Sequence, residues 1–97
     1  MDKKDIQQIL KKNLSFLKSE YGVEALFLFG SYARNTEKKK SDIDLLVEFS
    51  TDIDLFSFIA LKEYLQGLLK KKVDLVTRDA IKPAMISNIE RDLVRVA

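Results

Sequence analysis

The chain contains no cysteine and no histidine among its 97 residues. Without cysteine it can form neither a disulfide framework nor a cysteine-based metal site. Without histidine it lacks the usual general base, the usual activator of a serine nucleophile and the commonest metal ligand. Any chemistry must therefore come from carboxylates, hydroxyl groups, lysine, arginine and the backbone.

Long apolar runs are also absent. The N-terminal segment MDKKDIQQIL has no apolar core of the kind found in signal peptides, and no run approaches membrane-spanning length. We therefore expect a cytoplasmic protein. Apolar residues make up 46% and charged residues 33% of the chain, values that are typical of globular proteins. The length predicts a single domain that spans residues 1–97.

Positive charge is concentrated in two short runs, Lys38–Lys40 and Lys70–Lys72, although the net charge is only +2. Such runs are typically solvated loops or helix ends, and a local anionic partner is the alternative. The small net charge gives no reason to expect direct binding to nucleic acid.

Apolar periodicity and turn signals predict alternating helices and strands. Helical spacing and cap signals mark residues 2–20, 55–69 and 83–91, and short apolar runs rich in β-formers mark 23–29, 42–49 and 72–77. A single helical turn is expected to start at Ser31, and residues 93–97 are expected to form a short edge strand. The predicted fold class is α/β (α+β), with a small mixed sheet of three to four strands flanked by helices.

The predicted strand directions bring four polar residues to one end of this sheet. If the first two strands are antiparallel neighbours, Ser31 and Asp42 lie at the same end. The helix after the second strand makes a crossover, so the third strand should run parallel to the second and place Asp74 there as well. Asp42 and Asp44 point to one face, because side chains alternate along a strand.

Three carboxylates this close favour a divalent cation. They repel one another and raise one another's pKa unless a cation neutralises them. Mg²⁺ commonly takes one or two carboxylates together with substrate phosphates, and two such ions stabilise the attacking and leaving oxygens of a phosphoryl displacement. A turn at Gly30 and Ser31 would offer N–H groups and a hydroxyl to phosphate oxygens. The pattern therefore favours metal-assisted phosphoryl chemistry.

Each of these features also has a purely structural explanation. An Asp-x-Asp sequence is common in caps and turns, Asp74 could pair with a nearby lysine, and Arg34 could pair with Glu37. Two other motifs are excluded. The loop lacks the central glycine and terminal glutamate of an EF-hand, and the Gly-Lys-Ser/Thr of a P-loop is missing.

The segment GSYARNTEKKKSDIDLLV, together with the downstream KVDLVT, resembles the signature of the nucleotidyltransferase superfamily that includes DNA polymerase β. The short chain and its C-terminal segment IKPAMISNIERDLVRVA resemble the minimal nucleotidyltransferases, the MNT domains of MntA-type antitoxins. The resemblance covers essentially the whole chain.

This resemblance implies a site, a reaction and a partner. It implies three catalytic and metal-binding carboxylates and three nucleotide-binding residues: Asp42, Asp44 and Asp74 for two Mg²⁺ ions, and Gly30, Ser31 and Arg34 for ATP. AMP would pass to a hydroxyl, expected to be a tyrosine of a HEPN-type toxin. The chain would then be the antitoxin of a toxin–antitoxin pair and part of a hetero-oligomer.

Two other functions stay open, and the sequence departs from the family's pattern at two points. The chain could neutralise a toxin by binding alone, or it could transfer a nucleotide to a small molecule such as an aminoglycoside. The glycine that often precedes the KVDLV strand is absent, and Gly67 stands earlier, so the end of the preceding helix is undefined. No second domain is expected, although larger relatives use one to bind base or acceptor.

Overall fold

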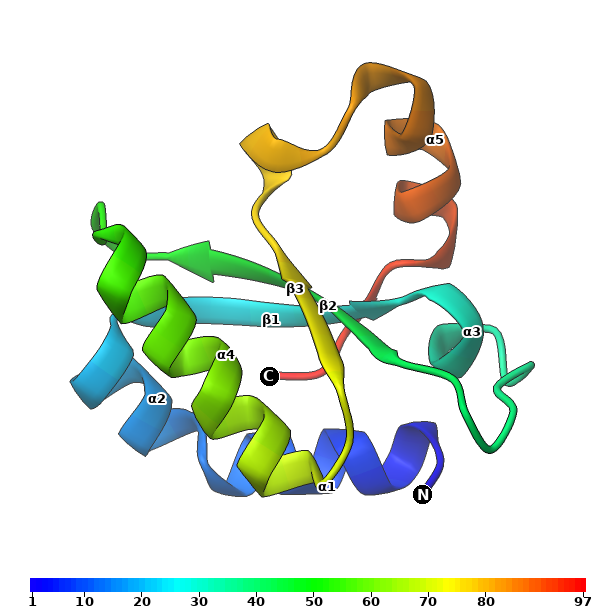
Figure 1. The fold of residues 1–97 in the computed structure, drawn as a ribbon, viewed down its shortest axis with the longest axis horizontal. Coiled ribbons are helices and arrows are strands. Elements are labelled where there is room, and N and C mark those ends of the chain that lie inside the picture. The colour runs from blue at the N-terminus through cyan, green and yellow to red at the C-terminus, as the bar shows by residue number, and fades with distance from the viewer.

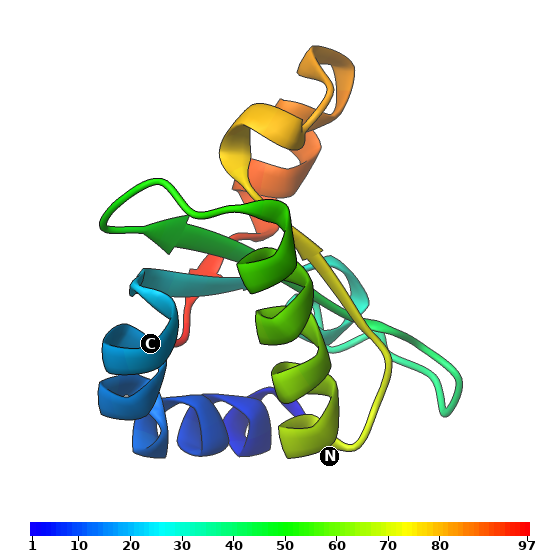
Figure 2. The ribbon, with the colours of Figure 1, turned by 60° about the vertical axis from the view of Figure 1, so that its left-hand side comes forward.

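The computed structural model describes residues 1–97, which form helices on both faces of a mixed four-stranded sheet (Figures 1 and 2). The elements follow the chain as α1 (Lys3–Lys12), α2 (Leu14–Tyr21), β1 (Val23–Phe29), α3 (Gly30–Ala33), β2 (Ile43–Phe49), α4 (Leu55–Leu69), β3 (Val73–Val76), the 3-10 helix η1 (Arg78–Ala80), α5 (Pro83–Asp92) and β4 (Val94–Arg95). The strand order is β3-β2-β1-β4. No helix combines the length and apolar character needed to cross a membrane.

The strand directions agree with the prediction from the sequence. β1 and β2 are antiparallel, and β3 runs parallel to β2 because α4 carries the chain back across the sheet. β4 pairs with β1, so the C-terminal segment is an edge strand, as expected. The sheet is therefore mixed, and the predicted fold class is confirmed.

The two faces of the sheet have different roles. Figures 1 and 2 show α1, α2 and α4 on one face and α5 on the other. The first face carries the main core, to which β2 contributes Ile43, Leu45 and Val47. Asp44 and Glu48 alternate with these residues and therefore point to the other face. No charged side chain is fully buried, so the carboxylates that could do chemistry are all at least partly exposed.

One predicted element was wrong, because residues 2–20 form two helices rather than one. α1 ends at Lys12, and α2 turns away from it (Figure 2). Asn13 lies between them. Its side-chain Nδ2 donates to the carbonyl of Ile9 at 2.8 Å, while its backbone N–H donates to Leu10 at 3.2 Å. The side chain thus takes the carbonyl that the next helical N–H would have used, and the helix stops. Regular apolar spacing on both sides of Asn13 hid this local competition.

The end of α4 shows where the glycine that often precedes the KVDLV strand would be expected, and that lysine stands there instead. Lys70 follows the last helical residue in the left-handed conformation, with φ 55°. Glycine adopts this conformation without strain, whereas a residue with a β-carbon does not.

We expect Lys70→Gly to raise the free energy of unfolding by about 1 kcal/mol, because it removes the left-handed strain at the end of α4. Urea unfolding would measure the change. Lys72→Gly is the matched control: it removes a lysine of the same run without relieving a positive φ and should not stabilise the protein.

Candidate active site

Asp44 lies at the centre of the cluster predicted from the sequence. In the sheet it is the register partner of Phe29 at the end of β1 and of Asp74 near the start of β3. Asp42 precedes the first residue of β2 and is exposed, as is Asp74, whereas Asp44 is half-buried. The predicted convergence of the three carboxylates on one end of the sheet is therefore present.

Gly30 touches this cluster directly. It follows β1, begins α3 and has φ 73°. A β-carbon at this position would overlap Asp44 Oδ2 and lie 3.0 Å from Asp44 Cγ. Glycine is thus required here both by the backbone conformation and by the approach of the carboxylate. Ser31 follows within the same helical turn, which begins one residue earlier than predicted.

The environment of Asp44 disfavours a negative charge. Burial raises its pKa to about 6, and the neighbouring charges of Asp74 and Asp42 act in the same direction, whereas Arg34 opposes them. A carboxylate held in this way binds a proton more tightly than usual, and a divalent cation at the same place would relieve the repulsion.

The donor chemistry suits Mg²⁺, although the side chains do not converge on one point. No group of three acidic side chains stands in an arrangement that could already hold a metal ion. Mg²⁺ does not require such a cage, because it usually keeps several waters and takes one or two carboxylates plus substrate phosphates. Asp44 and Asp74, adjacent across β2 and β3, match that requirement.

Arg34 forms an ion pair that the sequence did not predict. Its Nη1 lies 2.6 Å from Oδ2 of Asp92, at the end of α5, and it does not pair with Glu37. The Arg34 side chain is 50% exposed and that of Asp92 only 17%. Arg34 therefore stands near the carboxylates but is held by α5, and a phosphate contact would require it to leave Asp92.

The Asp92 carboxylate competes with phosphate for Arg34, so removing its charge should strengthen nucleotide binding. An exposed ion pair contributes about 0.2–1 kcal/mol, so Asp92→Asn is expected to lower the Kd for a non-hydrolysable ATP analogue by up to about fivefold. Isothermal titration calorimetry would measure it. Asp79→Asn removes one negative charge from a residue outside any ion pair and is the matched control. In an Arg34→Ala background, Asp92→Asn should have no effect; a gain there would contradict this interpretation.

The two lysine runs meet at the same end of the sheet as the carboxylates. Lys71 Nζ donates to the carbonyl of Lys39 at 3.0 Å, and the Ile43 N–H donates to the carbonyl of Lys72 at 3.0 Å. All three ion pairs of the structure involve arginine. The alternative in which Asp74 pairs with a lysine is therefore wrong, and positive charge borders the carboxylates without neutralising them.

Arg78 joins η1 to the outer face of the sheet. It lies 2.7 Å from Glu48 and 3.8 Å from Glu90 of α5, and its guanidinium stands over the ring of Phe27, 5.5 Å from the centroid. These contacts hold the chain between β3 and α5 against the face that carries Asp44. Sequence reasoning identified neither η1 nor this arginine.

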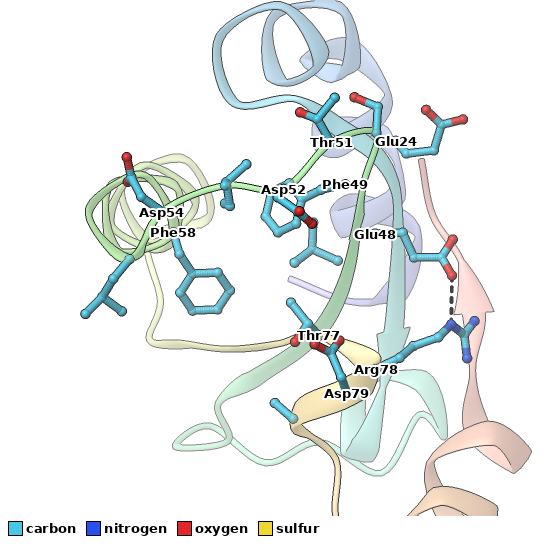
Figure 3. A pocket seen from close by; sticks show the side chains of 15 residues that line it. Glu24, Glu48, Phe49, Thr51, Asp52, Asp54, Phe58, Thr77, Arg78 and Asp79 are labelled. Atoms are coloured by element: carbon cyan, nitrogen blue, oxygen red, sulfur yellow. Dashed lines mark hydrogen bonds and ion pairs between the residues drawn. The ribbon is translucent and has the colours of Figure 1, made fainter.

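The largest hollow of the molecule lies away from the carboxylates. It has a volume of about 840 Å³ and is bordered by the loop after β2 and by η1 (Figure 3). Phe49, Phe58 and Thr77 line it, so it lies at the far ends of β2 and β3. It contains none of the residues predicted for catalysis, so the candidate active site stays at the end of the sheet that carries the three carboxylates.

A smaller cavity, of about 240 Å³, borders Asp74. Phe29, Met85 and Ile89 contribute apolar walls, the last two from α5. Sequence reasoning did not identify these residues. The apolar positions of residues 83–91 were the available signal, but they did not show which face of α5 turns toward the carboxylates.

Comparisons with known proteins show the family of the chain. The family model described as "Nucleotidyltransferase domain" matches residues 10–96. The protein adenylyltransferase MntA of Thermococcus cleftensis is 38% identical over 92 residues, covering 95% of this chain and 93% of its own. A relative from Methanocaldococcus jannaschii, named as a candidate protein adenylyltransferase, is 48% identical over 93 residues and 95% of each chain.

Solved structures give the same assignment. A structure described as a candidate minimal nucleotidyltransferase superposes with a TM-score of 0.80 at 32% identity, covering 97% of this chain and 95% of its own. An antitoxin in complex with a Shewanella oneidensis HEPN toxin shares the fold, with a TM-score of 0.67 at 22% identity over 95% of this chain and 71% of its own. The family model, the relatives and the fold thus agree that this chain belongs to the nucleotidyltransferase family and is a minimal nucleotidyltransferase of the MntA type.

Proposed function

We propose that this protein transfers AMP from ATP, with Mg²⁺, to a tyrosine hydroxyl of a HEPN-type toxin and thereby acts as its antitoxin. The observation that carries the proposal is the position of Asp44, between Asp74 and the close approach of Gly30. The relatives are named as protein adenylyltransferases, which supports AMP as the transferred group. A tri-AMPylated HEPN toxin, solved with an antitoxin of the same fold, supports the partner.

The proposed roles follow from position. Asp42 and Asp44 would hold two Mg²⁺ ions, and Asp74 would be the third ligand. The positive charge of these ions would stabilise the negative charge on the attacking and leaving oxygens. Gly30 and Ser31 would present backbone N–H groups and a hydroxyl to the triphosphate. Positive charge from Arg34 would add a phosphate contact.

The reaction is a displacement at the α-phosphorus. The acceptor oxygen forms a bond to that phosphorus, the bond from phosphorus to the oxygen bridging to the β-phosphate breaks, and pyrophosphate leaves. The acceptor's proton passes to the Asp74 carboxylate and then to water. Carboxylates positioned this way contribute by holding the reactants in line as well as by taking the proton.

Label transfer tests the proposal. With α-³²P-ATP, Mg²⁺ and a purified HEPN-type toxin as acceptor, label should appear on the toxin and be recovered as AMP on tyrosine. EDTA should stop the transfer, and excess Mg²⁺ should restore it. Stoichiometric binding of the toxin without any label transfer would contradict the proposal.

Neutralisation by binding alone is the second candidate, because exposed apolar residues offer a docking surface. Leu55 is 68% and Phe56 83% exposed at the start of α4, and Ile59 is 44% exposed one turn later. Growth rescue of toxin-expressing cells separates the two functions. A variant without transferase activity that still restores growth would favour binding alone.

A further inference from the structure

The apolar side chains of α5 are only partly covered by the rest of the protein. None of its residues is buried, although the helix packs against β1 on the outer face of the sheet. Met85, which is on this helix, is 53% exposed. An amphipathic helix normally buries its apolar stripe against the body of the protein. The exposed methionine at a packed element therefore indicates space for another group.

That space is the cavity of about 240 Å³ beside Asp74. The only charged side chains that border it are Asp74 and Lys82. Its other walls are apolar and are formed by Phe29, Val76, Ala80, Ile81, Met85 and Ile89. Phe29 and Asp74 are both register partners of Asp44, so the cavity opens directly onto the carboxylates.

We propose that this cavity receives the aromatic ring of the acceptor tyrosine and that Phe29, Met85 and Ile89 are specificity-determining residues. The inference rests on the proposed function and adds to it the place where the acceptor binds. A ring seated between α5 and Phe29 would direct its hydroxyl toward Asp74. The displacement then proceeds as above, with the phenolic oxygen bonded to the α-phosphorus, pyrophosphate released and the proton on the Asp74 carboxylate.

Size and polarity favour a phenol over the nucleoside of ATP. The cavity is smaller than the roughly 300–1,000 Å³ typical of pockets for drug-sized ligands, so it suits one side chain. A nucleobase would need several hydrogen-bonding partners, whereas the walls are mostly apolar and offer only the side chains of Asp74 and Lys82. Gly30 and Ser31, the proposed contacts of the triphosphate, do not line it. The nucleotide and the acceptor would therefore approach the carboxylates from different sides.

Methyl NMR tests the site directly, because the chain has only two methionines, Met1 and Met85. Protein labelled with ¹³C-methyl methionine should show two signals. Titration with p-cresol, a surrogate for the tyrosine side chain, should shift the Met85 signal and leave that of Met1 unchanged. The non-hydrolysable analogue AMP-PNP with Mg²⁺ should shift it less and should not displace p-cresol. Competition between the two ligands, or a Met85 signal that p-cresol does not shift, would overturn the assignment.

Kinetics with the toxin give an independent test. Met85→Ala is expected to raise KM for the toxin about tenfold, within the range found for trimming an apolar pocket, and to leave KM for ATP within twofold. Ile86→Ala is the matched control, since Ile86 is the next residue of α5 but does not line the cavity. A tenfold rise in KM for ATP with unchanged KM for the toxin would assign the cavity to the base instead. If the unsubstituted protein transfers no label, the proposed function fails, while the NMR titration still decides whether the cavity binds a phenol.

Discussion

Asp44→Asn is expected to abolish nucleotidyl transfer and, at the same time, to make the ligand-free protein more stable at neutral pH. The activity should fall by at least about 1,000-fold, because this residue stands between the other carboxylates and would hold the metal ions that stabilise the transition state. The gain in stability follows from the same placement. Burial and the charges of Asp74 and Asp42 disfavour an ionised carboxylate at this position.

The direction of the pH dependence follows from the raised pKa. The pKa of Asp44 is about 6 in the folded protein and about 3.8 for an unperturbed aspartate. Between these two values the folded state holds a proton that the unfolded state has lost, so this residue's contribution to stability falls as the pH rises from about 4 to about 6. Because Asp44 is only half-buried, we expect the gain of Asp44→Asn at pH 7.5 to be about 1 kcal/mol, or roughly 4–8 °C in Tm.

Thermal unfolding at pH 3.5 and pH 7.5 in EDTA measures this effect. The stability difference between Asp44→Asn and the unsubstituted protein should be present at pH 7.5 and be mostly lost at pH 3.5, where the aspartate is protonated in the folded state and largely protonated in the unfolded state. Added Mg²⁺ should raise the Tm of the unsubstituted protein but not that of the variant. Asp52→Asn, at an exposed position after β2, should behave like the unsubstituted protein throughout. If Asp44→Asn is less stable than the unsubstituted protein at pH 7.5, the ionised Asp44 carboxylate does not destabilise the folded state and the expectation is wrong.

The convergence of the carboxylates could be predicted because it depends on rules of connectivity. A long helix between two strands gives a parallel crossover, which set the direction of β3 relative to β2 and placed Asp74 at the same end as Asp44 without any knowledge of side-chain packing. The antiparallel pairing of β1 and β2 was an assumption, because the connection through residues 30–42 is long enough for either direction. The absence of cysteine and histidine left carboxylates as the candidate metal ligands, and their assignment stays a prediction.

The arrangement of the outer face could not be predicted in this way. Arg34 and Asp92 are 58 residues apart, and their ion pair exists only because α5 returns across the sheet. Arg78 likewise depends on the simultaneous presence of Glu48, Glu90 and Phe27. Apolar periodicity identifies α5 as a helix but not the surface against which it lies. The cavity beside Asp74 is a consequence of that placement and has no signature in the local sequence.

Gly30→Ala is expected to lower both activity and stability. Alanine is strained in the left-handed backbone conformation of this position, and its methyl group would overlap the Asp44 carboxylate. The left-handed φ of 73° alone costs roughly 1–2 kcal/mol in an alanine. The new β-carbon would also overlap the carboxylate of Asp44, so that either α3 or the carboxylate must move. We expect a loss of about 2 kcal/mol in the free energy of unfolding. Transfer should fall by about 100-fold or more, since a displacement near 1 Å is enough to misplace reacting groups.

Gly67→Ala is the matched control. Gly67 lies within α4, and a β-carbon there would meet no atom within 4 Å. Alanine is the better helix former, so this variant should gain about 0.5–1 kcal/mol and keep full activity. The same chemical change is therefore expected to act in opposite directions at two glycines of one chain. Urea unfolding and the label-transfer assay on both variants measure the contrast.

A double substitution separates the two causes of the loss at Gly30. Asp44→Ala removes the carboxylate, after which the nearest remaining atom of residue 44 would be its β-carbon at 3.3 Å. If steric overlap contributes, Gly30→Ala should cost less stability in the Asp44→Ala background than in the unsubstituted protein. The part that persists is the backbone strain at φ 73°. Equal costs in both backgrounds would show that Asp44 swings away freely and that the glycine is required only by the turn into α3.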